Sequence, residues 1–82
     1  IMTAYREEAL AIAAALSRLG PASPKALRSV GASPKTGRVL LDNHYGWFDH
    51  PAKGVYALSE PGREALAAQP ELAADLLARF TF

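Results

Sequence analysis

Ala22-Ser23-Pro24-Lys25 is nearly repeated ten residues later as Ala32-Ser33-Pro34-Lys35. In each copy the serine can cap free backbone N–H groups. The proline suits the first helical position, because its missing N–H would be unpaired there anyway. Two helix starts this close predict a short helix over residues 24–30, a turn at Gly31 and a second helix over residues 34–44. A short helix, a tight turn and a second helix form the helix-turn-helix pattern.

Upstream of this motif, the spacing of apolar residues predicts an amphipathic helix that ends at Gly20-Pro21. Intervals of four and three place one set on a single helical face: Tyr5, Ala9, Ile12, Leu16 and Leu19. We expect this face to lie against the helices that follow.

Downstream of the motif, two aromatic and β-branched runs predict strands over residues 46–50 and 54–58, joined by a tip at residues 51–54. Alternation points Phe48, Tyr56 and Leu58 toward the core. It turns Trp47 away from Phe48, and we expect Trp47 to pack against the protein.

Two further helices are predicted after the hairpin. Ser59 caps the first, with Pro61 in its first turn, and Gln69-Pro70 breaks the chain before a last helix over residues 71–80. That helix carries an apolar stripe made of Leu72, Leu76, Leu77 and Phe80. The stripe could cover the chain's own core, a second copy of the chain or a neighbouring domain. We divide the chain into a domain over residues 1–68 and a helical extension over residues 69–82.

The predicted fold class is mainly α with a small β-hairpin (α+β). An isolated hairpin is barely stable in water, so this one must pack on the helices. The expected architecture is therefore a winged helix-turn-helix, with a three-helix core, a two-stranded wing and additional C-terminal helices.

The stretch from Gly54 to Arg63 resembles the wing strand and following helix of bacterial winged-helix domains, where an aromatic-x-Leu-Ser/Thr strand end leads into Gly-Arg. Together with residues 41–48, it is similar to the C-terminal region of a family of uncharacterised bacterial proteins. The N-terminal part of those proteins is predicted to be a nuclease-like phosphodiesterase of the PD-(D/E)XK type. The resemblance implies that this chain is an accessory domain. The Pro-Asp and the Glu-x-Lys or Asp-x-Lys that such a nuclease needs do not occur in it.

Charge is distributed unevenly along the 82 residues. The net charge of the whole chain is +1, but residues 18–53 carry six Lys or Arg and two Asp, a net +4. A basic middle between acidic ends favours a surface that faces an anion.

The absence of cysteine suits a cytoplasmic protein, and the longest apolar stretch, residues 9–16, is too short to span a membrane.

The helix over residues 34–44 is expected to enter the major groove of double-stranded DNA. Lys35, Arg38 and Asp42 share its outer face, and the residues assigned to its packed face are Gly37, Leu40, Leu41 and His44. The preceding helix would cross the phosphate backbone, and the wing would reach the duplex at its tip. The candidate DNA-contacting residues are Lys25, Arg28, Ser33, Lys35, Thr36, Arg38, Asn43, His50 and Lys53.

Two other interpretations stay open. The same helix face could be ordinary solvated surface with an Arg38–Asp42 ion pair, and the serines could serve only as caps. A winged helix with so few cations could also be a protein-interaction or dimerisation module that does not bind DNA. We expect no cofactor, no metal site and, because no catalytic constellation is evident, no enzyme activity in this chain.

Overall fold

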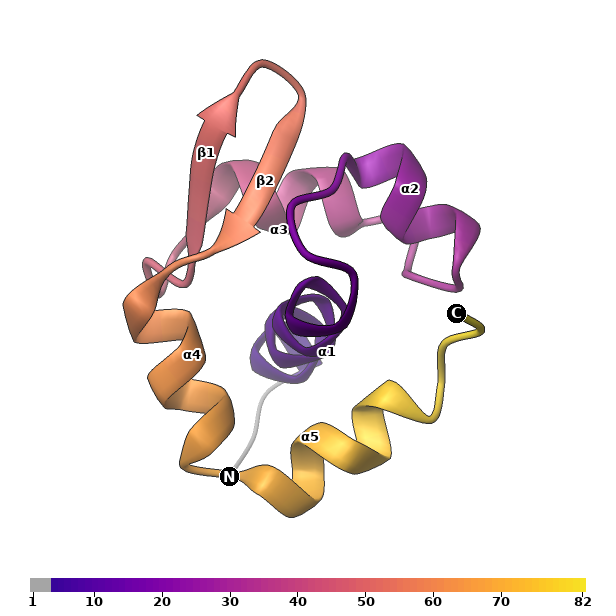
Figure 1. Cartoon of the computed structure of the whole chain (residues 1–82), viewed down its shortest axis with the longest axis vertical. Helices are drawn as coiled ribbons and strands as arrows, with labels where there is room; N and C mark the ends of the chain where they lie inside the picture. The colour runs from indigo at the N-terminus through magenta and orange to yellow at the C-terminus, as the bar shows by residue number, and fades with distance from the viewer. Residues whose placement is uncertain (1–3) are drawn as a thin grey trace.

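One central helix organises the molecule. The computed structural model describes residues 4–82, and Figure 1 views the first helix, α1, almost end-on with the other elements around it. In chain order the elements are α1 (Ala4–Leu19), α2 (Pro24–Ser29), α3 (Thr36–Asp42), β1 (Phe48–Ala52), β2 (Val55–Leu58), α4 (Glu60–Ala67) and α5 (Pro70–Leu77). The predicted fold class, mainly α with a small β-hairpin, is confirmed, and the layout is winged-helix-like.

The middle of α1 is buried nearly all round, because elements pack on several of its sides. Leu10, Ile12 and Leu16 are each at most 2% exposed, and the alanines at positions 9 and 13–15 are buried with them. A helix enclosed in this way is apolar on more than one face. The single-face prediction was therefore too narrow, and it was wrong for Leu19, which is 40% exposed at the end of the helix.

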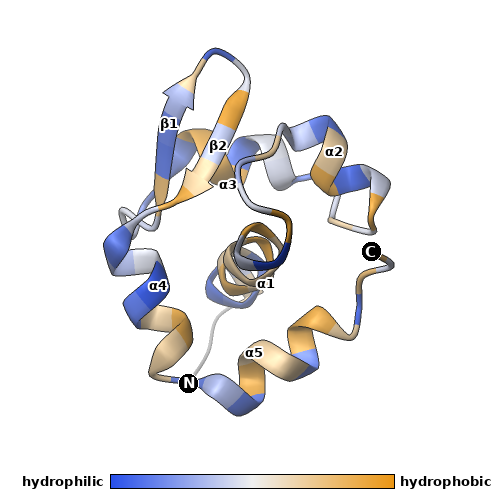
Figure 2. Cartoon of the chain, viewed as in Figure 1, coloured by the Kyte–Doolittle hydropathy of each residue, from blue (hydrophilic) through white to orange (hydrophobic). Residues whose placement is uncertain are grey.

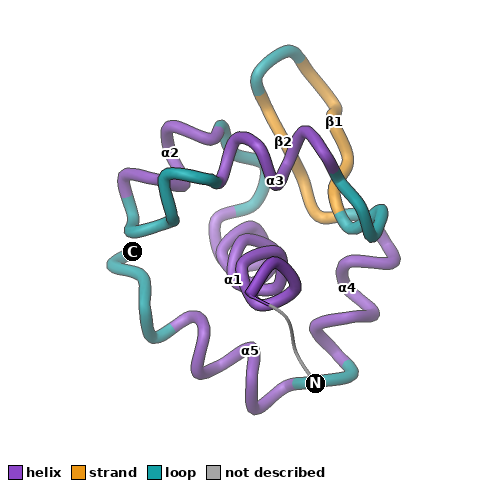
Figure 3. Tube along the Cα trace, turned by 180° about the vertical axis from the view of Figure 1, so that it is seen from behind, coloured by secondary structure: helices purple, strands orange, loops and turns teal. Residues whose placement is uncertain are grey.

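The helix-turn-helix segment begins where α1 ends. Gly20 adopts the left-handed conformation (φ 80°) and donates its N–H to the carbonyl of Leu16, which closes the last turn of α1. Ser23 caps α2 as predicted, since its side chain accepts a hydrogen bond from the N–H of Ala26. Gly31, with φ 115°, lies in the turn between α2 and α3. These features place α2 and α3 side by side, as Figure 3 shows from behind.

The hairpin is anchored to the body by a third piece of backbone. Phe48 pairs with Leu58 at its base, and one extra residue on β1 between Asp49 and Ala52 forms a β-bulge. On the other edge of β2, Tyr56 exchanges both backbone hydrogen bonds with Ala22, at 2.8 and 2.9 Å. The hairpin is thereby fixed to the segment between α1 and α2.

Trp47 packs against the protein as predicted. It does not point away from the core that holds Phe48, which alternation had predicted. Both Trp47 and Phe48 are 6% exposed and belong to the same core cluster. Because β1 begins only at Phe48, strand alternation does not apply to Trp47. Its ring stacks on that of Tyr45, with centroids 4.5 Å apart.

The last two helices close the core against α1. Ser59 caps α4 by accepting from the N–H of Gly62, and its own hydroxyl donates to the carbonyl of Gly46 at 2.7 Å. Helix α5 packs along α1 and buries Leu76 completely. Hydropathy colouring in Figure 2 shows apolar residues concentrated on α1 and α5, and hydrophilic ones along the first half of α4. The apolar stripe of the last helix therefore covers the chain's own core, at least at Leu76.

The domain division at residue 68 stays a prediction, and residues 1–3 of the first domain lie outside the described part of the chain.

Two contacts bring the segment after α5 to the turn between α2 and α3. Thr81 donates its N–H to the carbonyl of Val30 at 2.8 Å, and the backbone around Arg79 passes close to Gly31. The chain end thus contributes directly to the helix-turn-helix.

Candidate nucleic-acid interface

The start of α3 differs from the prediction by two residues. Ser33 does not cap the helix; instead its side chain accepts from the N–H of Lys35, at 3.1 Å, inside a turn. Thr36 donates both its N–H and its hydroxyl to the carbonyl of Ser33, so the helix begins only at Thr36. Thr36 is fully buried, and the DNA contact predicted for it does not fit this burial. The second Ser-Pro-Lys thus folds as a turn, although the first is a helix cap.

The packed face of α3 consists of Thr36, Val39 and Leu40, all at most 3% exposed. This spacing turns position 41 outward, and Leu41 is 75% exposed, so its assignment to the packed face was wrong. His44 lies after the end of α3 and is exposed, with its ring edge against Tyr5 at 5.0 Å. An exposed leucine in the last turn of α3 is the feature that sequence reasoning missed here.

The outer face of α3 presents the two predicted cations. Lys35 and Arg38 are both exposed. Arg38 forms an ion pair with Asp42, with Nε and Oδ2 3.6 Å apart and side chains 83% and 33% exposed. A surface pair of this kind contributes little to stability. Arg38 can therefore exchange Asp42 for another anion at small cost.

Helix α2 brings a further cation to the same place. Gly37 of α3 faces Arg28, and a Cβ added at Gly37 would lie 3.9 Å from Nη1 of that guanidinium. Lys25 lies one turn earlier on α2 and is exposed, as Arg28 is. The guanidinium of Arg28 therefore lies against the first turn of α3, the end of the helix at which Lys35 and Arg38 are exposed.

Asn43 serves the structure rather than the outer face. It ends α3 in the left-handed conformation (φ 46°, ψ 45°). Its side-chain amide donates to the carbonyl of Phe48 at 2.9 Å and accepts from the N–H of Phe48 at 3.1 Å. Both ends of the amide are occupied, so the DNA contact predicted for Asn43 does not fit its geometry. The paired bonds set the angle between α3 and the hairpin.

We expect Asn43→Ala to lower the free energy of unfolding by about 2–3 kcal/mol, since it removes two hydrogen bonds and leaves alanine at positive φ. Asn43→Gly loses the same bonds but adopts the conformation freely, and should cost roughly 1 kcal/mol less. Urea denaturation followed by Trp47 fluorescence measures both. Equal stability of Asn43→Ala and the unaltered protein would contradict the role assigned to the amide.

The hairpin carries the remaining candidates. Lys53 is exposed at the turn, next to Gly54 (φ 73°). The ring of His50 stacks on that of Tyr56 across the strands, with centroids 4.4 Å apart and planes at 3°. Figure 3 shows α3 between α2 and the hairpin, so all three elements that carry exposed candidate residues are neighbours.

An aromatic cluster beside this surface was not predicted as a unit. Tyr5, Tyr45 and Trp47 are linked ring to ring, and the guanidinium of Arg6 lies 5.2–5.4 Å from the ring centroids of Tyr45 and Trp47. Burial raises the pKa of the Tyr5 hydroxyl, and the nearby backbone of His44 partly offsets the rise. The cluster fixes the start of α1 against the segment between α3 and β1.

Across residues 4–82, no three His, Asp or Glu side chains converge in a way that could hold a metal ion. The two histidines serve as ring partners for tyrosines, His44 for Tyr5 and His50 for Tyr56. None of the helices in this described part of the chain combines the length and the hydropathy that a membrane span requires.

Comparison with known families gives one match. Residues 1–65 match the family described as "Putative PD-(D/E)XK phosphodiesterase (DUF2161)". The match covers well over half of the chain, and the chain belongs to this family. No curated protein and no solved structure matches the chain significantly.

The family assignment corrects one prediction. We predicted no enzyme activity from the sequence, because no catalytic constellation was evident. The family is described as a phosphodiesterase, which is a hydrolase, and the prediction that the chain is not an enzyme was therefore wrong. The resemblance to PD-(D/E)XK phosphodiesterases, which pointed to the same family, is confirmed.

Proposed function

We propose that this chain binds duplex DNA as a winged helix-turn-helix and contributes that binding to a phosphodiesterase of its family. In this proposal α3 enters the major groove, α2 follows the phosphate backbone and the β1–β2 hairpin is the wing. A phosphodiesterase of nucleic acid needs a surface that holds a polyanion, and backbone contacts by cations supply most of such affinity.

The observation that carries the proposal is that exposed cations of two helices lie at the same end of α3. Arg28 of α2 lies against Gly37, and Lys35 and Arg38 project outward from the same end of α3. A group of exposed positive charges at one end of a helix favours the binding of an anion. Lys25 and Lys53 extend this positive surface along α2 and to the tip of the wing.

The charges also define what kind of binding to expect. Asp42 lies on the outer face of α3 and pairs with Arg38, while the wing offers one lysine at its tip. Thr36 and Asn43 are the polar residues that could have read bases, but Thr36 is buried and both side chains are bonded to backbone groups of the protein. We therefore propose weak, sequence-tolerant binding that rests on phosphate contacts.

Five cations bound the salt dependence: Lys25, Arg28, Lys35, Arg38 and Lys53. If all five meet phosphates, log affinity should fall with log salt with a slope no steeper than about −4.5. Removing two of them with Lys35→Ala/Arg38→Ala should bring the slope to about −2.7 and weaken binding at least about tenfold at moderate salt. Fluorescence anisotropy of a labelled duplex at several salt concentrations measures both quantities.

The matched control is Arg18→Ala/Arg63→Ala, which removes the same charge from α1 and α4 and leaves α2, α3 and the hairpin unchanged. This variant should change the slope by less than about half a unit. No binding by the unaltered protein at tens of micromolar in low salt would overturn the proposal, and so would equal binding by the two double variants.

A second candidate function rests on Leu41. Its side chain is exposed in the last turn of α3, on the outward side of the helix that also carries Arg38. An exposed leucine beside Lys35, Arg38 and Asp42 is also the pattern of a protein-docking surface, with an apolar centre and a charged rim. If the chain is an interaction or dimerisation module, DNA binding is absent, and Leu41→Ser lowers self-association in sedimentation velocity.

A further inference from the structure

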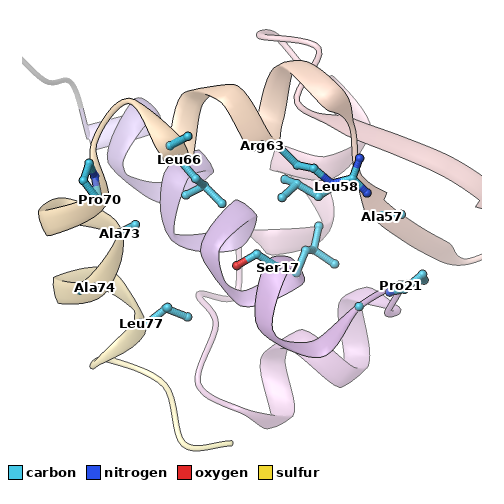
Figure 4. Close-up of a pocket in the computed structure, with 13 residues that line it drawn as sticks. Ser17, Pro21, Ala57, Leu58, Arg63, Leu66, Pro70, Ala73, Ala74 and Leu77 are labelled. Carbon is cyan, nitrogen blue, oxygen red and sulfur yellow. The ribbon is translucent and has the colours of Figure 1, made fainter.

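A groove that shares none of the candidate DNA-contacting residues opens on another side of the molecule. It lies between α4 and α5, reaches the C-terminal half of α1, and has a volume of about 600 Å³. Figure 4 shows side chains from all three helices turned toward it, with Leu66 and Leu77 on either side. Pockets of about 300–1,000 Å³ with mostly apolar walls are the usual size for small organic ligands.

Small residues create this α4–α5 groove. Gly20, Ala57, Ala73 and Ala74 line it where larger side chains would have filled the space. Leu16 and Leu58 form part of the lining and are at most 7% exposed, so the groove reaches down to the hydrophobic core. An apolar chain lying in it would remove its own surface and that of the groove from water together, which is favourable.

Arg63 is the one ionisable residue that lines the groove. Its side chain extends beside Leu58 toward Ala57 (Figure 4). Among residues 4–82 the structure gives Arg63 no ion pair, neither with Glu60 nor with Glu64, the acids nearest to it in sequence.

The position of Arg63 on α4 does not stabilise its positive charge either. It lies in the first turns of α4, just after the Ser59 cap, where the helix dipole disfavours a positive charge. A cation that gains nothing from its helix and has no ion pair is available to a ligand. A guanidinium presents its N–H groups in a fork that matches a carboxylate.

We propose that the α4–α5 groove binds a small aliphatic monocarboxylate. The carboxylate accepts hydrogen bonds from Arg63, and the alkyl chain lies along Leu66 and Leu77 over Leu16 and Leu58. The apolar walls of the groove favour a ligand with an alkyl chain. The single cation, Arg63, favours a ligand with one negative charge and fixes the direction in which it lies.

The probe is octanoate below its micelle concentration, with octan-1-ol and octylamine as ligands of the same length and different charge. Titration into the ¹⁵N-labelled protein should shift the amide signals of residues 63–67 and 73–77. Octylamine should bind at least about tenfold more weakly than octanoate, because Arg63 repels it, and octan-1-ol should fall between them.

Two variants test the two halves of the site. Arg63→Gln should weaken octanoate about tenfold and leave octan-1-ol unchanged, because only the charge-assisted bonds are lost. Ala74→Leu fills the groove from an exposed helix position and should weaken both ligands. Its amide spectrum reports whether it folds, and Ala67→Leu, at another exposed position of the lining, provides an independent block.

Equal affinity for octanoate and octylamine would overturn the proposal. Amide shifts scattered over the whole surface, or unchanged octanoate binding by both filled variants, would do the same. Since Arg63 and the alanines are not part of the positive surface on α2 and α3, loss of octanoate binding and loss of DNA binding are separate results.

Discussion

Gly62→Ala should be among the most damaging single-methyl changes in this protein. A Cβ at position 62 would overlap the carbonyl oxygen of Trp47 and Cδ1 of Leu58. Neither can move easily: the Trp47 oxygen also accepts from the N–H of Ser59 at 2.9 Å, and Leu58 is part of the core. Forced overpacking of this kind costs about 3 kcal/mol. In a domain of this size that corresponds to a fall in Tm of roughly 12–24 °C.

The control for this change is Gly37→Ala, the same substitution in another helix. A Cβ there meets its neighbours at ordinary contact distances of 3.9–4.0 Å. Alanine favours a helix over glycine by up to about 1 kcal/mol, so Gly37→Ala should be neutral or stabilising. Calorimetry of both variants gives the comparison. If Gly62→Ala melts at the same temperature as the unaltered protein, α4 does not pack against Trp47 as described.

Leu76→Ala is expected to lower the free energy of unfolding by about 3–4 kcal/mol, because the side chain is fully buried where α5 meets α1. The matched control is Leu41→Ala, at a side chain that is 75% exposed, which should change stability by less than about 0.5 kcal/mol. Urea denaturation measures both changes.

The shape of the transition also tests the proposed division at residue 68. A single transition at a lower midpoint places α5 in the same cooperative unit as the rest of the chain. A separate early transition confined to residues 69–82 would show that the C-terminal helix is an independent extension. If Leu76→Ala is as stable as Leu41→Ala, Leu76 does not pack between α5 and α1 as described.

The Ser-Pro signals for helix starts predicted the helices correctly at two of three places. Ser23-Pro24 and Ser59 with Pro61 became helix caps, and in each the serine side chain accepts from the backbone N–H three residues later. Ser33-Pro34 carries the same signal, but Thr36 supplied a rival partner for the Ser33 carbonyl and a buried methyl for the core. Whether Ser33 caps a helix or forms a turn depended on the burial of Thr36. Residue spacing in the sequence does not show that burial.

The candidate interface was predictable in its charges but not in its polar residues. Exposed cations such as Lys35 and Arg38 follow from their position opposite the apolar face of α3. Asn43 looked like a base-reading residue, yet its amide is bonded to Phe48, five residues away on another element. Leu41 was misassigned because the packed face is centred on Val39 and Leu40, and a rotation of one residue moves a leucine into water.

The backbone pairing between Ala22 and Tyr56 has a consequence for how the protein behaves when crowded. An unpaired strand edge is a template on which a second chain can add, and it starts aggregation. Ala22 occupies the outer edge of β2. The outer edge of β1 carries a bulge, the charge of Asp49 and Pro51, which has no N–H to donate. Both edges of the hairpin thus carry a feature that opposes cross-β growth by further copies of the chain.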